Sequence, residues 1–523
     1  MMTQGSLRAK SGPSRPATRT QGDDCPRYKR ASFGRSIPSR VLAAAVSVAI
    51  VLSGCAVGPN YKRPAVDVPT DFRSAEGQAQ QASLADLPWW EVFKDPRLQE
   101  LVRTALKNNY DLRIAISRVE QSRQLQAQAR SQFLPFVNYS TVNSDGRNEF
   151  AGTVAPNGGI TRGTFVGAAS VAWEADVWGR IRRLNESAQA QYLATEEARR
   201  GVMLTLVSDV AQAYLELLEL ELELQIAKDT TASFGDTLKF FNQRYEGGVA
   251  TKLDTSRAAA AQATSAAAIP ETERQIALKE NQISVLLGEN PGPIPHDAKL
   301  LDEIVPPDVP AGLPSALLER RPDILQAEQQ MRAANAQVGV ATANFFPQIG
   351  LTALFGRASS PLSAITSGQA TVWSIAANMT GPIYQGGALT AQKRQAVAAW
   401  QQAQLQYQET ALNAFQDVAN ALISRQKFDA TLIEQNRSVE NYEVAVKISL
   451  QRYETGKANY YEVLEAQQLL YPAQNAVAQT ELNRRTIIVQ LYKALGGGWN
   501  LSDPQWMGTS PVSSQSPAPK TSP

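Results

Sequence analysis

Few residues in this 523-residue chain have types and spacing that could support covalent or metal chemistry. The two cysteines, Cys25 and Cys55, offer thiols, and the single histidine, His296, offers a metal ligand. His296 lies in a Pro-rich linker, where we expect a solvated loop residue rather than a metal site. The sequence contains no phosphate-binding glycine loop followed by Lys-Ser/Thr, no nucleophile elbow and no cluster of metal ligands. We therefore expect no enzyme and no cofactor.

Cys55 directly follows an apolar run over residues 41–52, which a basic, Pro/Ser-rich leader precedes. The run has about the length of a signal-peptide core and is too short to span a bilayer as a helix. The tripeptide before the thiol, Leu52-Ser53-Gly54, resembles the end of a bacterial lipobox, in which the cysteine becomes the lipid attachment point. We predict a signal peptide over residues 1–54 and a mature chain that starts at Cys55.

The lipobox resemblance implies a covalent diacylglycerol and an N-acyl lipid on Cys55. Ala56 follows the cysteine, which resembles lipoproteins sent on to the outer membrane. An ordinary cleavage site with an incidental cysteine is the alternative interpretation.

The net charge of +2 is dominated by the leader. Nine Lys/Arg and two Asp precede Cys55, so the mature chain carries 42 basic and 47 acidic groups. No basic stripe with interleaved aromatic residues is present, and this argues against a nucleic-acid partner. Long tracts rich in Ala, Gln, Glu and Leu favour very long helices over many compact domains.

The chain is an internal duplication. Residues 111–135 reappear as 323–347, and the pentapeptide that starts at Arg244 (RYEGG) reappears at Arg452 (RYETG). Because the landmarks keep their order across two halves, each half is one building unit.

Each unit begins with a predicted helix of roughly 35 residues, over 98–134 and 314–346, that ends at a proline, Pro135 or Pro347. An alternating pattern typical of strands follows, then a loop rich in Gly, Ser, Asn or Pro (Asn157-Gly158-Gly159 in the first half), and then a second alternating stretch. One face of these stretches is apolar over about ten residues, which fits a transmembrane strand. A hairpin packed on a soluble core would give the same pattern, so the strands alone leave both open.

Four strands do not close a barrel, and open strand edges are not viable in lipid. If these strands enter a membrane, several chains must share one barrel. Three chains would supply twelve strands.

The second strand of each unit continues into a predicted helix of about 65 residues, over 181–245 and 389–453, which would be roughly 95 Å long. A glycine-containing turn and a returning helix follow each one. Thr251 with Asp254, and Asn459 with Glu462, have the spacing of helix N-caps with an acidic partner. We expect the first helix of each unit to stack end to end with the returning helix, and Pro270 and Pro472 to kink the returning helices.

Four groups of residues, in this order, resemble the TolC-type outer-membrane efflux proteins, and more closely their lipoprotein branch that serves resistance-nodulation-division pumps. They are Gly54-Cys55-Ala56-Val57-Gly58-Pro59-Asn60-Tyr61, Trp89-Trp90 with Asp95-Pro96-Arg97-Leu98, Leu313-Pro314-Ser315 with Arg320-Arg321-Pro322-Asp323, and Tyr492-Lys493-Ala494-Leu495-Gly496-Gly497-Gly498-Trp499. The match runs from Cys55 to about Trp499.

The resemblance implies a mixed α/β membrane protein, in which a long coiled-coil-like helical barrel is continuous with a trimeric, twelve-stranded transmembrane β-barrel. It implies a passive exit duct that receives drugs or other toxic small molecules from an inner-membrane proton-driven pump through a periplasmic adaptor. The expected segments are a signal peptide (1–54), a lipid-anchored segment (55–97), a first repeat (98–290), a linker (291–313), a second repeat (314–499) and a disordered tail (500–523).

The resemblance also assigns a periplasmic gate. An aromatic and an acidic residue on the last long helix form rings across the trimer in this family, and Tyr461 and Glu465 occupy those positions. They are four residues apart and so share one helix face. A solvated glutamate and an aromatic residue packed between helices are the alternative. Many relatives carry a basic residue at Gln468, so a tip salt bridge is not implied here, and Arg257, at the place of Glu465 in the first half, is expected to pair with an acidic group.

The two glycine-containing turns are the expected adaptor contacts, because their small residues let a partner's backbone approach closely. They comprise Gly247, Gly248, Val249, Ala250, Gly456 and Ala458. The exit duct of a type I protein-secretion system, and a periplasmic coiled-coil scaffold without a pore, are the alternative functions.

Overall fold

The computed structural model describes residues 56–73, 83–147, 161–302 and 312–506. The predicted signal peptide, Cys55 and the predicted loop through Asn157-Gly158-Gly159 lie outside these residues. All elements described below belong to the unit that follows Gly54.

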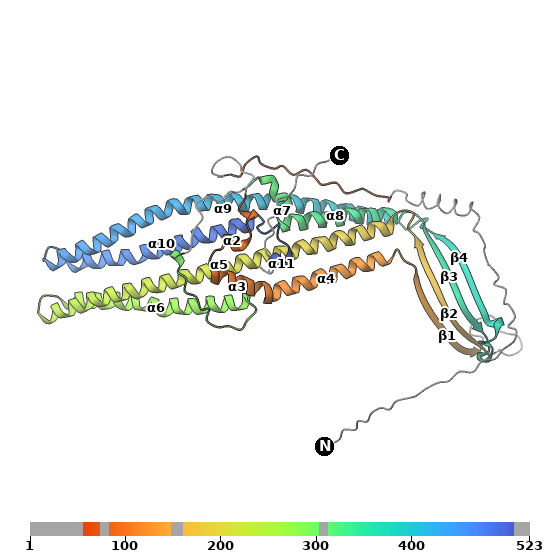
Figure 1. Ribbon diagram of the computed structural model, residues 1–523, viewed down its shortest axis with the longest axis horizontal. Coiled ribbons are helices and arrows are strands. Elements are labelled where there is room, and N and C mark those ends of the chain that lie inside the picture. Colours follow the sequence, from red (N-terminus) through yellow and green to blue (C-terminus); the bar gives the residue numbers. More distant parts are fainter. Residues whose placement is uncertain (1–55, 74–82, 148–160, 303–311, 507–523) are drawn as a thin grey trace, which may run out of the picture. The chain divides into compact units, whose positions relative to one another are not determined.

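Two long helices dominate the described chain (Figure 1). They are α5 (Arg180–Glu246) and α9 (Ala388–Glu454), each 67 residues long, which corresponds to about 100 Å. Each begins after a glycine in the left-handed region, with φ of 81° at Gly179 and 87° at Gly387. The predicted long helices are thus confirmed, and the two copies begin in the same way.

A tight turn joins each long helix to a returning helix, α6 (Lys252–Leu286) or α10 (Tyr460–Ala494). At α6 the predicted capping box is formed: Asp254 N donates to Thr251 Oγ1, and Thr251 N donates to Asp254 Oδ2. At α10 Glu462 N donates to Asn459 Oδ1 over 3.3 Å. Both returning helices continue through their proline; a kink at Pro270 or Pro472 stays a prediction.

The predicted uninterrupted first helix of each unit is wrong. The first unit has α3 (Pro96–Asn108) and α4 (Tyr110–Ser131), separated at Asn109. The second unit has α7 (Leu317–Arg320) and α8 (Pro322–Ala343), separated at Arg321. Asn109 leaves the helical conformation because its side chain caps α4, and Arg321 does so because it precedes a proline.

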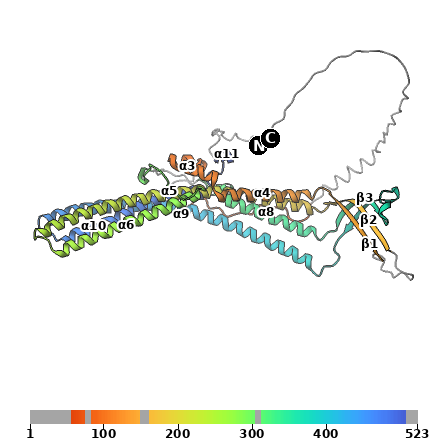
Figure 2. The same cartoon turned by 90° about the horizontal axis from the view of Figure 1, so that it is seen from below.

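The two breaks allow the predicted end-to-end stacking of helices. Asn109 Nδ2 donates to Leu286 O over 3.0 Å, which joins α4 to the end of α6. Arg321 Nη1 donates to Ala494 O over 3.0 Å, which joins α8 to the end of α10. Figure 2 shows α4 and α6, and likewise α8 and α10, following one another along the long helices.

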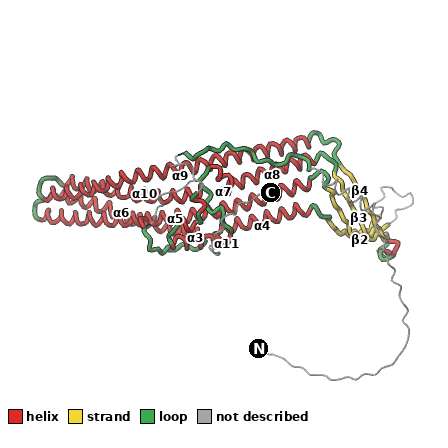
Figure 3. The backbone as a smooth tube through the Cα atoms, turned by 45° about the horizontal axis from the view of Figure 1, so that its top comes forward, coloured by secondary structure: helices red, strands yellow, loops and turns green. Residues whose placement is uncertain are grey.

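The strands form one antiparallel sheet in the order β1-β2-β3-β4. The strands lie at one end of the long helices (Figure 3). They are β1 (Phe136–Arg147), β2 (Thr161–Ala175), β3 (Gln348–Ser359) and β4 (Thr371–Thr380). The hairpins of the two units pair directly through β2 and β3, while β1 and β4 each pair with one neighbour in the described chain.

The apolar face of this sheet is not covered by the described helices. Tyr139 on β1 is 88% exposed, and Trp373, Ile375 and Met379 on β4 are 71%, 80% and 71% exposed. A hairpin packed on a soluble core would bury such side chains. The observed exposure therefore favours the transmembrane interpretation of the alternating pattern over the soluble one.

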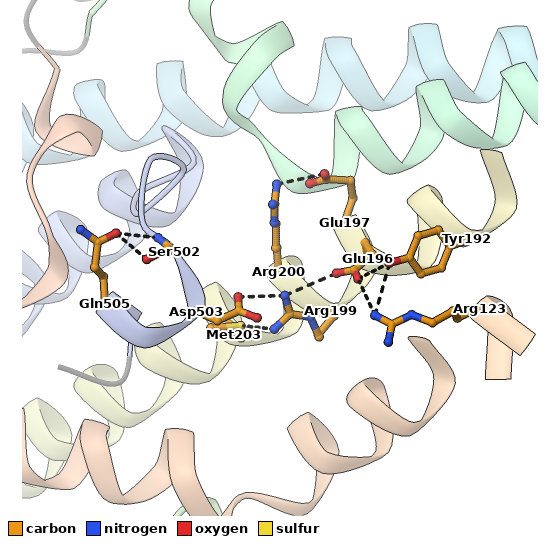
Figure 4. A network of polar contacts seen from close by, with 10 residues as sticks. All are labelled: Arg123, Tyr192, Glu196, Glu197, Arg199, Arg200, Met203, Ser502, Asp503 and Gln505. Carbon is orange, nitrogen blue, oxygen red and sulfur yellow. Dashed lines mark hydrogen bonds and ion pairs between the residues drawn. The ribbon is translucent and has the colours of Figure 1, made fainter. Parts of the chain in front are cut away.

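The main apolar core lies where α3, α5 and α10 meet, and the C-terminal segment belongs to it. The short helix α11 (Asp503–Trp506) ends in a buried Trp506, whose carbonyl accepts from Trp89 Nε1. Arg199 Nη2 on α5 lies 2.9 Å from Asp503 Oδ1 (Figure 4). The prediction of a disordered tail from Asn500 is wrong as far as Trp506, because an aromatic anchor and an ion pair hold this segment.

His296 is also not the solvated loop residue that its linker position suggested. Its side chain is 5% exposed, Nε2 lies 3.0 Å from Glu221 Oε1, and the ring packs edge-on against Tyr214. Within the described ranges no group of His, Cys, Asp or Glu has an arrangement that could hold a metal ion.

Glu219 on α5 is a buried carboxyl that should make stability depend on pH. Burial, followed by the neighbouring Glu223 carboxylate, raises the pKa of Glu219 to about 8. The pKa of Glu219 in the folded protein lies above its unfolded value of about 4.3. Protonated Glu219 therefore contributes to stability below about pH 4.3, and this contribution is lost as pH rises through about 8. Between about pH 5 and about pH 9, the Tm of the variant Glu219→Gln should therefore fall by less than the Tm of the parent protein. Equal losses in the two proteins would contradict this prediction.

Candidate functional site

An extended strap, residues 56–63, lies beside the sheet. Val57 N donates to Trp178 O over 3.0 Å, between β2 and α5. Gly58 has φ +98° and lies so close to α8 that an added Cβ would be 2.5 Å from Gly339 Cα. The residue that follows Cys55 thus lies where the strands continue into the long helices.

Side chains of α5 and α8 hold the strap in place. Arg183, whose side chain is 5% exposed, donates from Nη2 to Asn60 Oδ1 over 2.6 Å. Asn335 Nδ2 donates to Pro59 O over 3.1 Å. Farther along, Tyr61 OH donates to Glu328 Oε1 over 3.0 Å. These contacts join the strap to both repeats, so its position is defined by several independent bonds.

The predicted gate residues lie on the exposed face of α10. Tyr461 is 56% exposed, and Glu465 and Gln468 are exposed on the following turns. The opposite face of the same turns is buried in an apolar cluster, which we call the tip cluster. It consists of Phe234 and Phe241 from α5, Ala258 and Ala261 from α6, and Tyr460, Val463 and Leu464 from α10. Tyr461 and Glu465 are therefore available to face a lumen or another chain, whereas their neighbours fix the helix.

Arg257 on α6 is exposed and makes no ion pair with the described residues of its own chain. The predicted pairing with an acidic group on a neighbouring helix is thus not found among the described residues.

The two turns have the same backbone geometry. Val249 N donates to Arg244 O and Lys457 N donates to Arg452 O, both over 2.8 Å. Gly248 and Gly456 both have φ +73°, and an added Cβ would meet nothing within 4 Å at either. Val249 is 65% exposed. The turns therefore present open backbone and small apolar side chains to solvent.

One contact between the two tips was not predicted from the sequence. The Arg244 guanidinium lies 5.1 Å from the ring centre of Tyr453 and 5.5 Å from that of Phe240, and so connects the tip of α5 to the tip of α9. Cation–π contacts of this kind stabilise by about 0.5–2 kcal/mol. The Arg-Tyr pair repeated at both tips was the available signal, but spacing alone did not show that the arginine of one copy packs on the tyrosine of the other.

Paired helices about 100 Å long run here from a sheet with an uncovered apolar face to two exposed tips. These features are typical of a membrane protein whose helices also extend through an aqueous compartment. The family model described as "Outer membrane efflux protein" matches residues 101–289 and 313–497. The chain belongs to this family.

Relatives and solved structures agree with this assignment. The solvent efflux pump outer membrane protein SrpC of Pseudomonas putida is 36% identical over 461 residues, which covers 87% of this chain and 97% of the relative. The cation efflux system protein CusC of Escherichia coli K12 is 31% identical over 454 residues, 86% and 98% of the two chains. The crystal structure of the MtrE outer membrane channel of Neisseria gonorrhoeae in its open state has 29% identity and a TM-score of 0.76, with 85% and 99% covered.

The predicted family is therefore confirmed, and the chain is an outer-membrane exit duct of an efflux system. The efflux relatives favour this function over type I secretion, and the channel structures favour it over a scaffold without a pore.

Proposed function

We propose that three copies of this chain form one duct, with a twelve-stranded barrel in the outer membrane and a helical tunnel in the periplasm. The observation that carries the proposal is the four-stranded sheet. Its apolar face is uncovered, and its two outer strands, β1 and β4, each pair with only one other strand among the described residues. Unpaired strand edges are not viable in lipid, so β1 of one copy must pair with β4 of the next. Closure after three copies gives a barrel wide enough for a lumen.

A cross-linking experiment tests the shared barrel. The mature chain contains no cysteine besides Cys55, so cysteines introduced at Tyr139 on β1 and Ile375 on β4 can be addressed selectively. In outer membranes, a flexible bis-maleimide should convert the double variant to covalent dimers and trimers, while each single variant stays mainly monomeric after denaturation. A double variant that stays monomeric would contradict the shared barrel.

Cys55 carries the lipid anchor in this proposal. The strap contacts support it, because they hold Ala56 against Gly179, where the strands meet α5. A diacylglycerol and an N-acyl lipid on Cys55 would then enter the periplasmic leaflet beside the barrel. Stable anchoring requires more than one acyl chain, which this modification supplies.

Tyr461 and Glu465 form the periplasmic gate in this proposal. Their exposure on α10, opposite the tip cluster, supports the assignment. Three tyrosine side chains would narrow the pore, and three carboxylates would make it favour cations. The duct performs no chemistry itself; an inner-membrane proton-driven pump supplies the energy and delivers drugs or other toxic small molecules.

The tips dock a periplasmic adaptor in this proposal, and Gly248 gives a sharp test. Both Gly248→Ala and Gly248→Trp place a side chain at φ +73°, so they carry a similar backbone cost. Only the tryptophan obstructs a partner, because the space around Gly248 is open within the chain. Gly248→Trp should abolish efflux at a normal trimer level, while Gly248→Ala should retain it. Equal efflux by the two variants, or loss of the trimer in the tryptophan variant, would argue against docking here.

A further inference from the structure

A cavity of about 480 Å³ lies between α5, α9 and α10 and reaches the tip of α9 at Tyr453. Val463 and Gln467 line it from α10, on the opposite face from Tyr461 and Glu465. The volume falls within the range of ordinary small-molecule sites, about 300–1,000 Å³. The cavity is therefore large enough for a two-ring organic molecule.

One part of the cavity is aromatic. Phe240, Phe241 and Tyr453 line it, with ring centres of Phe241 and Tyr453 5.0 Å apart and those of Phe240 and Phe241 5.5 Å apart. The rings suit packing with a planar apolar group. They do not supply the attraction for a cation, because the Arg244 guanidinium already lies over Phe240 and Tyr453.

Another part of the cavity is acidic. Asp229 and Asp236 line it from α5, are exposed, and make no ion pair with the described residues. They are seven residues apart, which places their Cα atoms about 10 Å apart along the helix on one face. Metal–oxygen bonds are about 2.0–2.6 Å long, so this spacing does not suit one metal ion bound by both carboxylates. It suits a larger organic cation.

Gln467 supplies a buried acceptor that lacks a donor. The residue is 6% exposed, and its Nε2 donates to Thr237 Oγ1 over 3.1 Å. The Thr237 hydroxyl in turn donates to Ser233 O over 3.0 Å, so the amide orientation is consistent with the hydrogen bonds around it. Gln467 Oε1 has no hydrogen-bond partner among the described residues. A buried acceptor without a donor is unfavourable, and a ligand N–H would satisfy it.

We propose that this cavity is a binding site for an aromatic primary amine in its protonated form. The ammonium group donates to Gln467 Oε1 and to the carboxylate of Asp236, which is next to Thr237 on α5, and the ring system packs against the three aromatic side chains. An anion would meet two carboxylates and an acceptor, and a neutral apolar molecule would leave Gln467 Oε1 unpaired. The inference concerns the wall of the duct and does not depend on the gate or on the adaptor.

Binding to the purified full-length protein in detergent tests the proposal. The probe is 1-naphthylmethylamine at neutral pH, and the matched control is 1-naphthylmethanol, which has the same ring and no charge. The amine should bind saturably at one site per chain, at least about tenfold more tightly than the alcohol, because hydrogen bonds to charged groups exceed neutral ones. Equal affinities, or no saturable binding of the amine, would overturn the proposal.

Variants locate the site. Asp236→Asn and Gln467→Met should each weaken amine binding about tenfold or more and reduce the preference for the amine over the alcohol. Asp111→Asn, an exposed change on α4 outside the cavity, is the control and should leave both affinities unchanged. Asp236 is exposed, so its variant should fold normally; a Tm measurement verifies this for both cavity variants. Unchanged amine affinity in a folded Asp236→Asn variant would show that the amine binds elsewhere.

Discussion

Replacing both Tyr461 and Glu465 with alanine should raise the single-channel conductance of the protein in planar bilayers severalfold. The two side chains are exposed on one face of α10, so their removal widens the proposed constriction without opening the tip cluster behind it. The single variant Glu465→Gln removes charge with little change in size. It should lower the preference for cations and leave the conductance close to that of the parent protein.

The internal repeat supplies the matched control for the gate variant. Leu253 and Arg257 occupy the corresponding positions on α6 and are likewise exposed, so their double alanine variant makes a similar change in the other returning helix. It should leave conductance unchanged. Unchanged conductance in the Tyr461/Glu465 variant, or an equal rise in the control, would contradict the assignment of the gate to α10.

Gly58→Ala should sharply reduce the amount of folded protein in the outer membrane. A left-handed residue with a side chain costs about 1–2 kcal/mol, and here the new Cβ would also lie 2.5 Å from the backbone of Gly339. Backbone atoms of α8 cannot move aside as a flexible side chain can. We therefore expect release of the strap, which can be measured as rapid proteolysis before Tyr61 and as a lowered Tm.

Gly386→Ala is the control that separates the effect of backbone strain from the effect of a steric clash with α8. Gly386 has φ +59°, but an added Cβ there meets nothing within 4 Å. This control should retain nearly normal levels of folded protein and a protected strap. If both variants behave alike, the close packing of the strap on α8 is not what holds the start of the chain.

The long helices and the strands were predictable because their signals are periodic and local. The apolar period changes from helical to alternating after Pro135 and Pro347 and changes back before α5 and α9, and the structure follows these changes. The duplication strengthened each assignment, since both copies had to satisfy one pattern.

The breaks at Asn109 and Arg321 were missed although each carries a local signal. An asparagine that can cap a following helix, and a residue before proline, both favour non-helical backbone. Around Asn109 the apolar pattern continues because α3 and α4 both pack on α5. Periodicity therefore could not reveal this break.

The buried positions of His296 and Trp506 depend on contacts distant in the sequence. His296 meets Glu221, and Trp506 accepts from Trp89. No local pattern encodes such partners. The same holds for the cavity behind α10, since its lining comes from three helices.

Intracellular accumulation of a fluorescent pump substrate tests the central claim most directly. It should be compared in a strain that lacks this chain, in the same strain complemented with it, and in one complemented with the Gly248→Trp variant. An exit duct predicts low accumulation only with the parent chain. High accumulation in all three strains, with the protein present in the outer membrane and the pump expressed, would contradict the account.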